Sequence, residues 1–172
     1  MTNISNENLF KQLYFSKTEK DVEDVILNNP NVFRDDNWFP LGGNENMFGI
    51  VRNQQSSPIA ALVEKVTNSI DAILVKKCLE FGVQPDSREA PRSMEEALRL
   101  FYPDYKNWDL KQNRRKQAED IQIIADGPPR ETSVIIYDNG EGQHPEKFED
   151  TFLSLVRGNK INIQFVQGKY NM

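Results

Sequence analysis

A chain of 172 residues is long enough for about one domain with a hydrophobic core of its own. Hydrophobic residues make up 38% of the sequence, and no apolar run approaches the length of a membrane span, which excludes a transmembrane protein. A single cysteine, Cys78, excludes an internal disulfide, and a net charge of −5 excludes binding of nucleic acid or anionic membranes through overall charge. A cytoplasmic protein is therefore expected, with Cys78 as a small buried residue.

The first predicted helix covers residues 18–28, with Val22, Val25 and Ile26 on its apolar side, and it ends before Pro30. The stretch that follows is rich in aromatic residues, glycine and asparagine. Its Gly-Gly pair lacks the lysine that a phosphate-binding loop needs, so an ordered loop is expected over residues 32–57.

The longest predicted helix begins at Ser57-Pro58, runs to about Phe81 and is followed by Gly82. Serine is a favoured N-cap, proline suits the first helical position, and glycine suits the residue after a helix. A period of 3.6 residues predicts one side that faces the core. The residues on that side are Leu62, Val66, Ile70, Ile73 and Leu74.

The opposite side of the same helix carries three polar residues, Glu64, Asn68 and Asp71, at spacings of four and three. Neither acid has a lysine four residues later, which a solvated helix face usually provides. Two interpretations stay open from the helix alone, a solvated face or the wall of a pocket. The neighbouring side chains are small or moderately apolar: Ala61, Thr67, Ala72, Val75 and Cys78.

Residues 82–119 are polar and contain several prolines, and we interpret them as a surface insertion that ligand binding does not need. Within them, Ser93 and Glu96 form the pattern of a capping box before a short helix over 94–101. The sequence KQNRRK at 111–116 holds four cations, typical of a solvated face, with nucleic-acid contact as the alternative.

Two predicted strands cover 121–125 and 133–137, and the turn between them, DGPPRE, indicates a hairpin. The continuous apolar run in the second strand indicates a buried strand, and a helix is expected to begin at Pro145. Helices around a sheet predict the α+β class, with a mixed α/β fold as the alternative.

Asp138 follows the second strand, and Gly140 and Gly142 come after it at alternate positions. Glycines at these positions let a ligand approach the backbone closely. An ionised aspartate only accepts hydrogen bonds, so it suits a ligand that presents N–H groups, such as the amino group of adenine.

Two motifs together resemble the GHKL superfamily, which includes gyrase B subunits, heat-shock chaperone ATPases, histidine kinases and MutL. EKVTNSIDA (64–72) matches the family pattern E-x-x-x-N-x-x-D-A, and DNGEG (138–142) matches D-x-G-x-G. FVQGKYNM (165–172) is similar to the opening of the family's glycine-bearing lid loop. The resemblance covers residues 51–172, so it implies an ATP-binding domain after an N-terminal extension, residues 1–50.

The resemblance implies a Bergerat-type α/β sandwich, a mixed sheet covered by helices, that binds ATP with Mg²⁺ and hydrolyses it slowly. Binding would drive dimerisation or closure, and the chain, which ends inside the lid, would be the N-terminal part of a larger ATPase. The implied roles are a general base, Glu64; a Mg²⁺ ligand, Asn68; supporting residues, Asp71 and Ala72; an adenine reader, Asp138, with room from Gly140 and Gly142; and the lid residue Gly168.

A non-catalytic module that senses nucleotide or binds a partner ATPase is the alternative. His144 is expected only to flank a helix, and Arg157, Asn159 and Lys160 match no motif.

Overall fold

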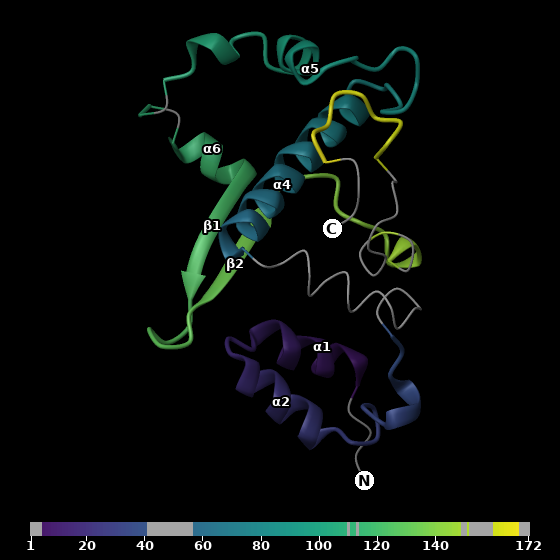
Figure 1. Ribbon diagram of the computed structural model, residues 1–172, viewed down its shortest axis with the longest axis vertical. Helices are drawn as coiled ribbons and strands as arrows, with labels where there is room; N and C mark the ends of the chain where they lie inside the picture. Colours follow the sequence, from purple (N-terminus) through teal and green to yellow (C-terminus); the bar gives the residue numbers. More distant parts are fainter. Residues whose placement is uncertain are drawn as a thin grey trace. The chain divides into compact units, whose positions relative to one another are not determined.

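The computed structural model describes residues 5–40, 57–109, 111–112, 114–148, 151 and 160–168 (Figure 1). The chain divides into two compact units. The first unit consists of Met1–Phe39 and Ile123–Ile135, and the second consists of Pro40–Gln122 and Ile136–Met172. Helices and a two-stranded antiparallel sheet place the protein in the α+β class, as predicted.

The first unit contains two helices, α1 (Asn6–Phe15) and α2 (Glu19–Asn28), and a short 3₁₀ turn, η1 (Asp35–Asn37). The predicted helix over 18–28 is confirmed as α2, whose capping box pairs Thr18 with Asp21. No sequence pattern predicted α1. In this unit the hairpin turn is fixed by an ion pair of 3.1 Å between Lys17 Nζ and Asp126 Oδ2.

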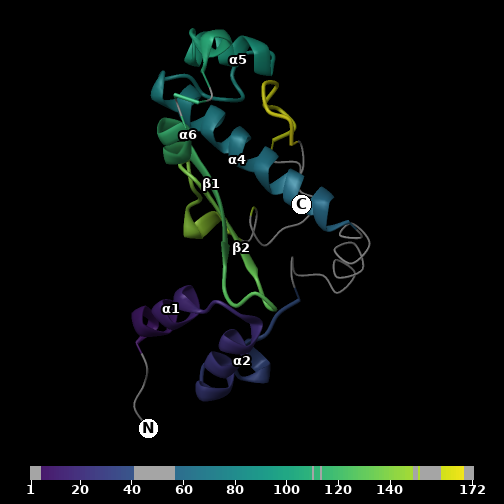
Figure 2. The same ribbon diagram turned by 90° about the vertical axis from the view of Figure 1, so that its left-hand side faces the viewer.

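The second unit is built around α4 (Pro58–Glu80), the longest helix in Figures 1 and 2. The predicted start of this helix is confirmed, because the Ser57 hydroxyl accepts a hydrogen bond from the Ala60 N–H and Pro58 is the first helical residue. The predicted end is confirmed as well, since Phe81 is the C-cap. Gly82 has a φ of 76°, a backbone conformation that favours glycine after a helix.

The side of α4 that faces the core differs from the predicted one. Ile73 and Leu74 are buried as expected, but Leu62 and Ile70 are 39% and 38% exposed. Helix α5 (Met94–Phe101) and the segment 160–168 pack instead on the side that carries Val75 and Cys78 (Figure 1). The core cluster consists of Leu74, Val75, Cys78, Ala90, Ala97, Phe101, Phe165 and Val166.

The segment 82–119 contains α5, the 3₁₀ turn η3 (Tyr105–Asn107) and α6 (Arg114–Asp120). The predicted cap of α5 is confirmed in part: Ser93 accepts from the Glu96 N–H, but the Glu96 carboxylate accepts from the Arg92 N–H rather than from that of Ser93. The expectation that the whole segment lies on the surface is wrong. Ala97 and Phe101, one helical turn apart on α5, both belong to the core.

The predicted hairpin is confirmed as β1 (Ile121–Asp126) and β2 (Ser133–Asp138). The expectation of a buried second strand is wrong, because Val134 and Ile135 are 58% and 45% exposed. The described residues supply only two strands, so the faces of β2 lack the cover that a larger sheet provides.

A 3₁₀ turn, η4 (Pro145–Lys147), begins at the predicted proline. Most of the helix expected after it lies outside the described residues, as does most of the loop 32–57. Within the described ranges, no helix is long and apolar enough to cross a membrane.

Candidate functional site

Every candidate site residue belongs to the second unit, where α4, the end of β2 with its loop, and the segment 160–168 meet. Figures 1 and 2 show the segment 160–168, in yellow, beside the C-terminal half of α4. Its Phe165 is fully buried in the core cluster with Cys78, which fixes the segment against the helix.

Asp138 is held in place through both of its carboxylate oxygens. Its Oδ2 accepts a hydrogen bond of 3.0 Å from the Ser69 hydroxyl of α4, and its Oδ1 accepts one of 3.0 Å from the Gly140 N–H. Ser69 is only 3% exposed, and no pattern in the sequence predicted a role for it. A carboxylate offers about four acceptor positions, so Asp138 can still accept hydrogen bonds from a ligand.

Gly140 packs so closely on α4 that no side chain fits. A Cβ there would lie 2.5 Å from the Cβ of Ala72 and 2.7 Å from Oδ1 of Asp138. Lys76, one turn after Ala72, donates hydrogen bonds of 2.9 and 3.0 Å to the backbone and side-chain oxygens of Asn139. The loop after β2 is therefore tied to α4 on both sides of Ala72.

Gly142 serves a different purpose in the same loop. Its φ of 67° favours glycine, and a Cβ would meet nothing within 4 Å. The second glycine of the motif thus allows the turn, whereas the first allows close packing.

Asp71 is completely buried and binds the segment 160–168. Its Oδ1 accepts from the Gln167 N–H at 2.9 Å, and its Oδ2 accepts from the Gly168 N–H at 2.8 Å. Asp71 therefore holds the segment 160–168 against α4. Gly168, the residue expected in the lid, thus donates its N–H to Asp71.

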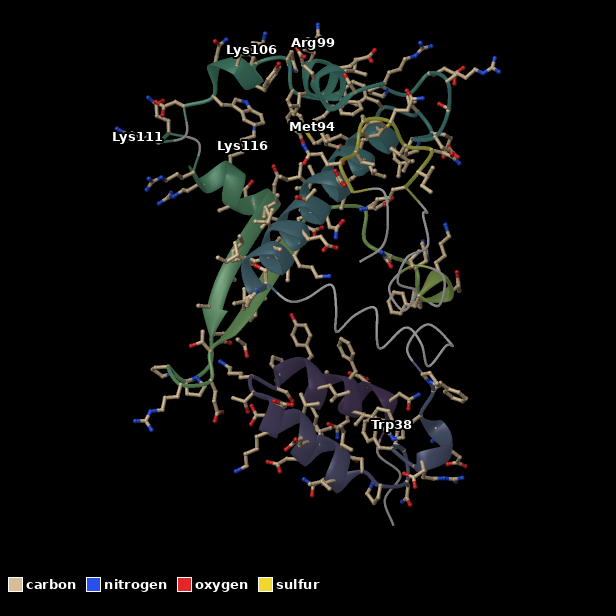
Figure 3. The ribbon with its side chains drawn as sticks, viewed as in Figure 1. Trp38, Met94, Arg99, Lys106, Lys111 and Lys116 are labelled. Atoms are coloured by element: carbon tan, nitrogen blue, oxygen red, sulfur yellow. The ribbon has the colours of Figure 1, made fainter. Side chains whose placement is uncertain are left out.

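Asn68 and Lys160 lie next to this pair. The Lys160 ammonium donates to Oδ1 of Asn68 at 3.3 Å and stands 3.9 Å from Oδ2 of Asp71. A Cβ at Gly168 would lie 3.0 Å from Oδ1 of Asn68 and 3.1 Å from Oδ2 of Asp71, so a larger residue there would crowd both oxygens. Gln167 also donates from its side chain to the sulfur of Met94 at 3.5 Å, and Figure 3 shows Met94 of α5 beside this segment.

Glu64 lies one turn before Asn68 on α4. Its Oε1 is buried, and no described residue gives it a hydrogen bond. A buried carboxylate oxygen without a donor is costly unless a water or a ligand supplies one.

Glu141 was not singled out from the sequence, where it occupies the variable position of D-x-G-x-G. The residue as a whole is exposed, but its carboxyl group is partly buried, and this burial raises the pKa of Glu141. The positive charges of Lys160 and Lys147 act in the opposite direction. His144 is exposed immediately before η4, as a flanking residue would be. Arg157 and Asn159 lie outside the described residues.

The described side chains near the candidate site offer few ligands for a metal ion. Within the described part of the chain, no three or more His, Cys, Asp or Glu side chains form a metal cluster. A metal at Asn68 would take one amide oxygen from the protein and its other ligands from water or phosphate.

A cavity of about 200 Å³ lies elsewhere in the second unit, lined by residues of the loop 85–92 with Asn162 and Gln164.

No family model, curated protein or solved structure matches the chain.

Proposed function

We propose that the chain is a GHKL-type module that binds ATP with Mg²⁺ and hydrolyses it slowly. The observation that carries the proposal is the contact between its two motifs. Asp138 and Gly140 of the second motif meet Ser69 and Ala72 of the first, through a hydrogen bond of 3.0 Å and a backbone approach that only glycine permits. The proposal includes a Bergerat-type sandwich as the fold in which this contact forms.

Asp138 is the proposed reader of adenine. Ser69 and Gly140 orient its carboxylate, and each uses only one lone-pair position on its oxygen. The charged acceptor suits an exocyclic amine, and charge-assisted hydrogen bonds of this kind are the stronger ones in proteins.

Asn68 is the proposed protein ligand of Mg²⁺. Its amide oxygen is a hard ligand, and Lys160 beside it indicates a position at which a positive charge is stabilised. The bound ion would neutralise charge on the phosphates. Lys160 is then free to move from Asn68 to a phosphate oxygen.

Glu64 is the proposed general base. Its buried oxygen, to which no described residue donates, can accept a hydrogen bond from a water molecule and then take a proton from it. The water oxygen forms a bond to the γ-phosphorus as the bond to the bridging oxygen breaks, which yields ADP and inorganic phosphate. Binding would drive closure of the lid or dimerisation.

A nucleotide sensor without turnover is the second candidate. Two hydrogen bonds favour it: the Gly168 N–H donates to Asp71, and the Lys160 ammonium donates to Asn68. Both contacts occupy groups that hydrolysis would require on the nucleotide.

The substitution Glu64→Ala separates the two candidates. Removing a general base lowers the rate by about 10²- to 10⁴-fold, whereas the affinity for Mg·ATP changes little, because Glu64 faces the water rather than the adenine. Asn68→Ala weakens both binding and turnover. Calorimetry and phosphate release measured on the same preparation give the two quantities.

Glu80→Ala is the matched control, since Glu80 lies at the exposed end of the same helix and pairs with Lys77. It should leave binding and turnover unchanged. Hydrolysis at the parent rate in Glu64→Ala would exclude Glu64 as the base. A parent chain that binds ATP but releases no phosphate selects the sensor.

A further inference from the structure

The stretch from Lys106 to Lys116, in the second unit, concentrates positive charge in an acidic chain. Across these residues there are five cations and a single acid, whereas the whole chain carries a net charge of −5. All five cations are exposed: Lys106, Lys111, Arg114, Arg115 and Lys116. Figure 3 shows three of them, Lys106, Lys111 and Lys116, along the path from η3 to α6.

These cations lack carboxylate partners in the described part of the chain, so their charge is not neutralised locally. Among the residues that the structure describes, none of the five forms an ion pair, and the one acid, Asp109, accepts a hydrogen bond from the backbone N–H of Lys111. Several cations elsewhere, though not all, form ion pairs with acids: Lys11, Lys17, Arg34, Lys77, Arg99 and Lys160.

The charged side chains of helix α6 interact unfavourably with the helix dipole. Arg114, Arg115 and Lys116 form its first turn, where acids are favoured, and Glu119 and Asp120 lie in its last turn, where cations are favoured. This arrangement destabilises an isolated helix. A feature that breaks a local rule in this way is expected where function requires it.

Aromatic rings lie in the same stretch as the cations. Trp108 is 43% exposed, and its ring packs edge-on against Tyr102 at 5.5 Å between centroids. The Lys106 ammonium lies 5.9 Å from the ring centroid of Tyr105. Proteins that bind single strands combine cations for the phosphates with aromatic rings on which bases stack.

We propose that the five exposed cations between Lys106 and Lys116, together with Trp108, form a binding surface for a single-stranded nucleic acid. The cations contact the phosphate backbone, and Trp108 stacks on an unpaired base. Because the rest of the chain is acidic, binding is confined to this surface rather than spread over the molecule. This surface does not depend on the proposed ATP site.

Binding of a fluorescent oligothymidylate of about 20 nucleotides to the full chain, measured by anisotropy, tests the proposal. Five phosphate contacts predict a slope of about −3.5 for log K against log salt, so affinity falls about 100-fold between about 50 and 200 mM salt. The triple variant Arg114→Gln, Arg115→Gln, Lys116→Gln should reduce that slope to about −1.4. Neutralising the first turn of α6 should also leave the fold intact, which circular dichroism verifies.

The matched control removes the same charge from the first unit, with Lys11→Gln, Lys20→Gln and Arg130→Gln. It should bind as the parent does. In a Trp38→Phe background, Trp108 is the only tryptophan, and its emission should be quenched on binding.

Three results would overturn the proposal. They are no saturable binding at about 50 mM salt, an equal loss of affinity in the control variant, and binding of inorganic polyphosphate as tight as that of the oligonucleotide. Trp108 emission that does not change on binding would contradict the stacking contact.

Discussion

At the scale of single residues, Asp71 shows how a buried charge can hold a loop. Both of its oxygens accept backbone hydrogen bonds, from Gln167 and Gly168, and Lys160 stands nearby. An acid buried this completely is stable only where donors surround it. The same side chain therefore fixes the positions of Gln167 and Gly168.

Asp71→Asn should destabilise the protein by about 1–3 kcal/mol, because the new amide N–H₂ group would face one of the two backbone donors. Chemical denaturation measures the change in the free energy of unfolding. Amide exchange of Gln167 and Gly168 should accelerate in the variant, since both N–H groups lose a charged acceptor.

Asp104→Asn is the control, because Asp104 is exposed and its side chain caps nothing at the start of η3. Its stability should match that of the parent. Equal stabilities for Asp71→Asn and the parent would mean that the bonds to the segment 160–168 do not hold it.

At the scale of elements, α5 is part of the core and not a surface insertion. Phe101 is 7% exposed and packs against Phe81 and Phe165, with ring centroids 5.2 and 6.4 Å away. Deleting 82–119 should therefore unfold the second unit, contrary to what its composition suggested.

Phe101→Ala should destabilise the protein by about 3–5 kcal/mol, the usual cost of removing a buried aromatic ring. Leu100→Ala is its neighbour on the same helix and is 47% exposed, so it should change stability by less than about 1 kcal/mol. Thermal and denaturant unfolding of both variants provide the comparison. Equal effects would show that α5 does not pack in the core.

The helix ends could be predicted from the sequence because their causes are local. Ser57-Pro58 and Thr18 act within three or four residues, so the pattern contains the whole interaction. The buried side of α4 could not be predicted in the same way. That helix has apolar residues on several sides, and the choice between them depends on α5 and Phe165, which lie far along the chain.

In the candidate site, too, residues in a local pattern could be predicted and residues with long-range contacts could not. Asn68, Asp71 and Asp138 could be named as candidates because their residue types and spacing form a pattern within the sequence. Ser69 could not be identified, since its role depends on a strand end 69 positions later. The same holds for Lys160, whose contact with Asn68 spans 92 positions.

At the scale of the whole molecule, the proposed functions occupy one of the two units. All the candidate ATP-site residues and the basic stretch 106–116 belong to the second unit. The first unit, built from α1, α2 and the hairpin turn, contains none of them. Nucleotide binding is therefore expected to respond to substitutions in the second unit and not to those in the first.

Calorimetric titration of ATP into the parent and Asp138→Asn tests the central claim most directly. The substitution replaces a charge-assisted acceptor and leaves a mismatched polar group, so binding should weaken by about 1.5–3 kcal/mol or more. Asp126→Asn, at the end of the other strand, is the control and should bind ATP as the parent does. ATP binding by the parent, lost in Asp138→Asn while circular dichroism shows an unchanged fold, is the predicted result. Unchanged affinity in Asp138→Asn would contradict the account.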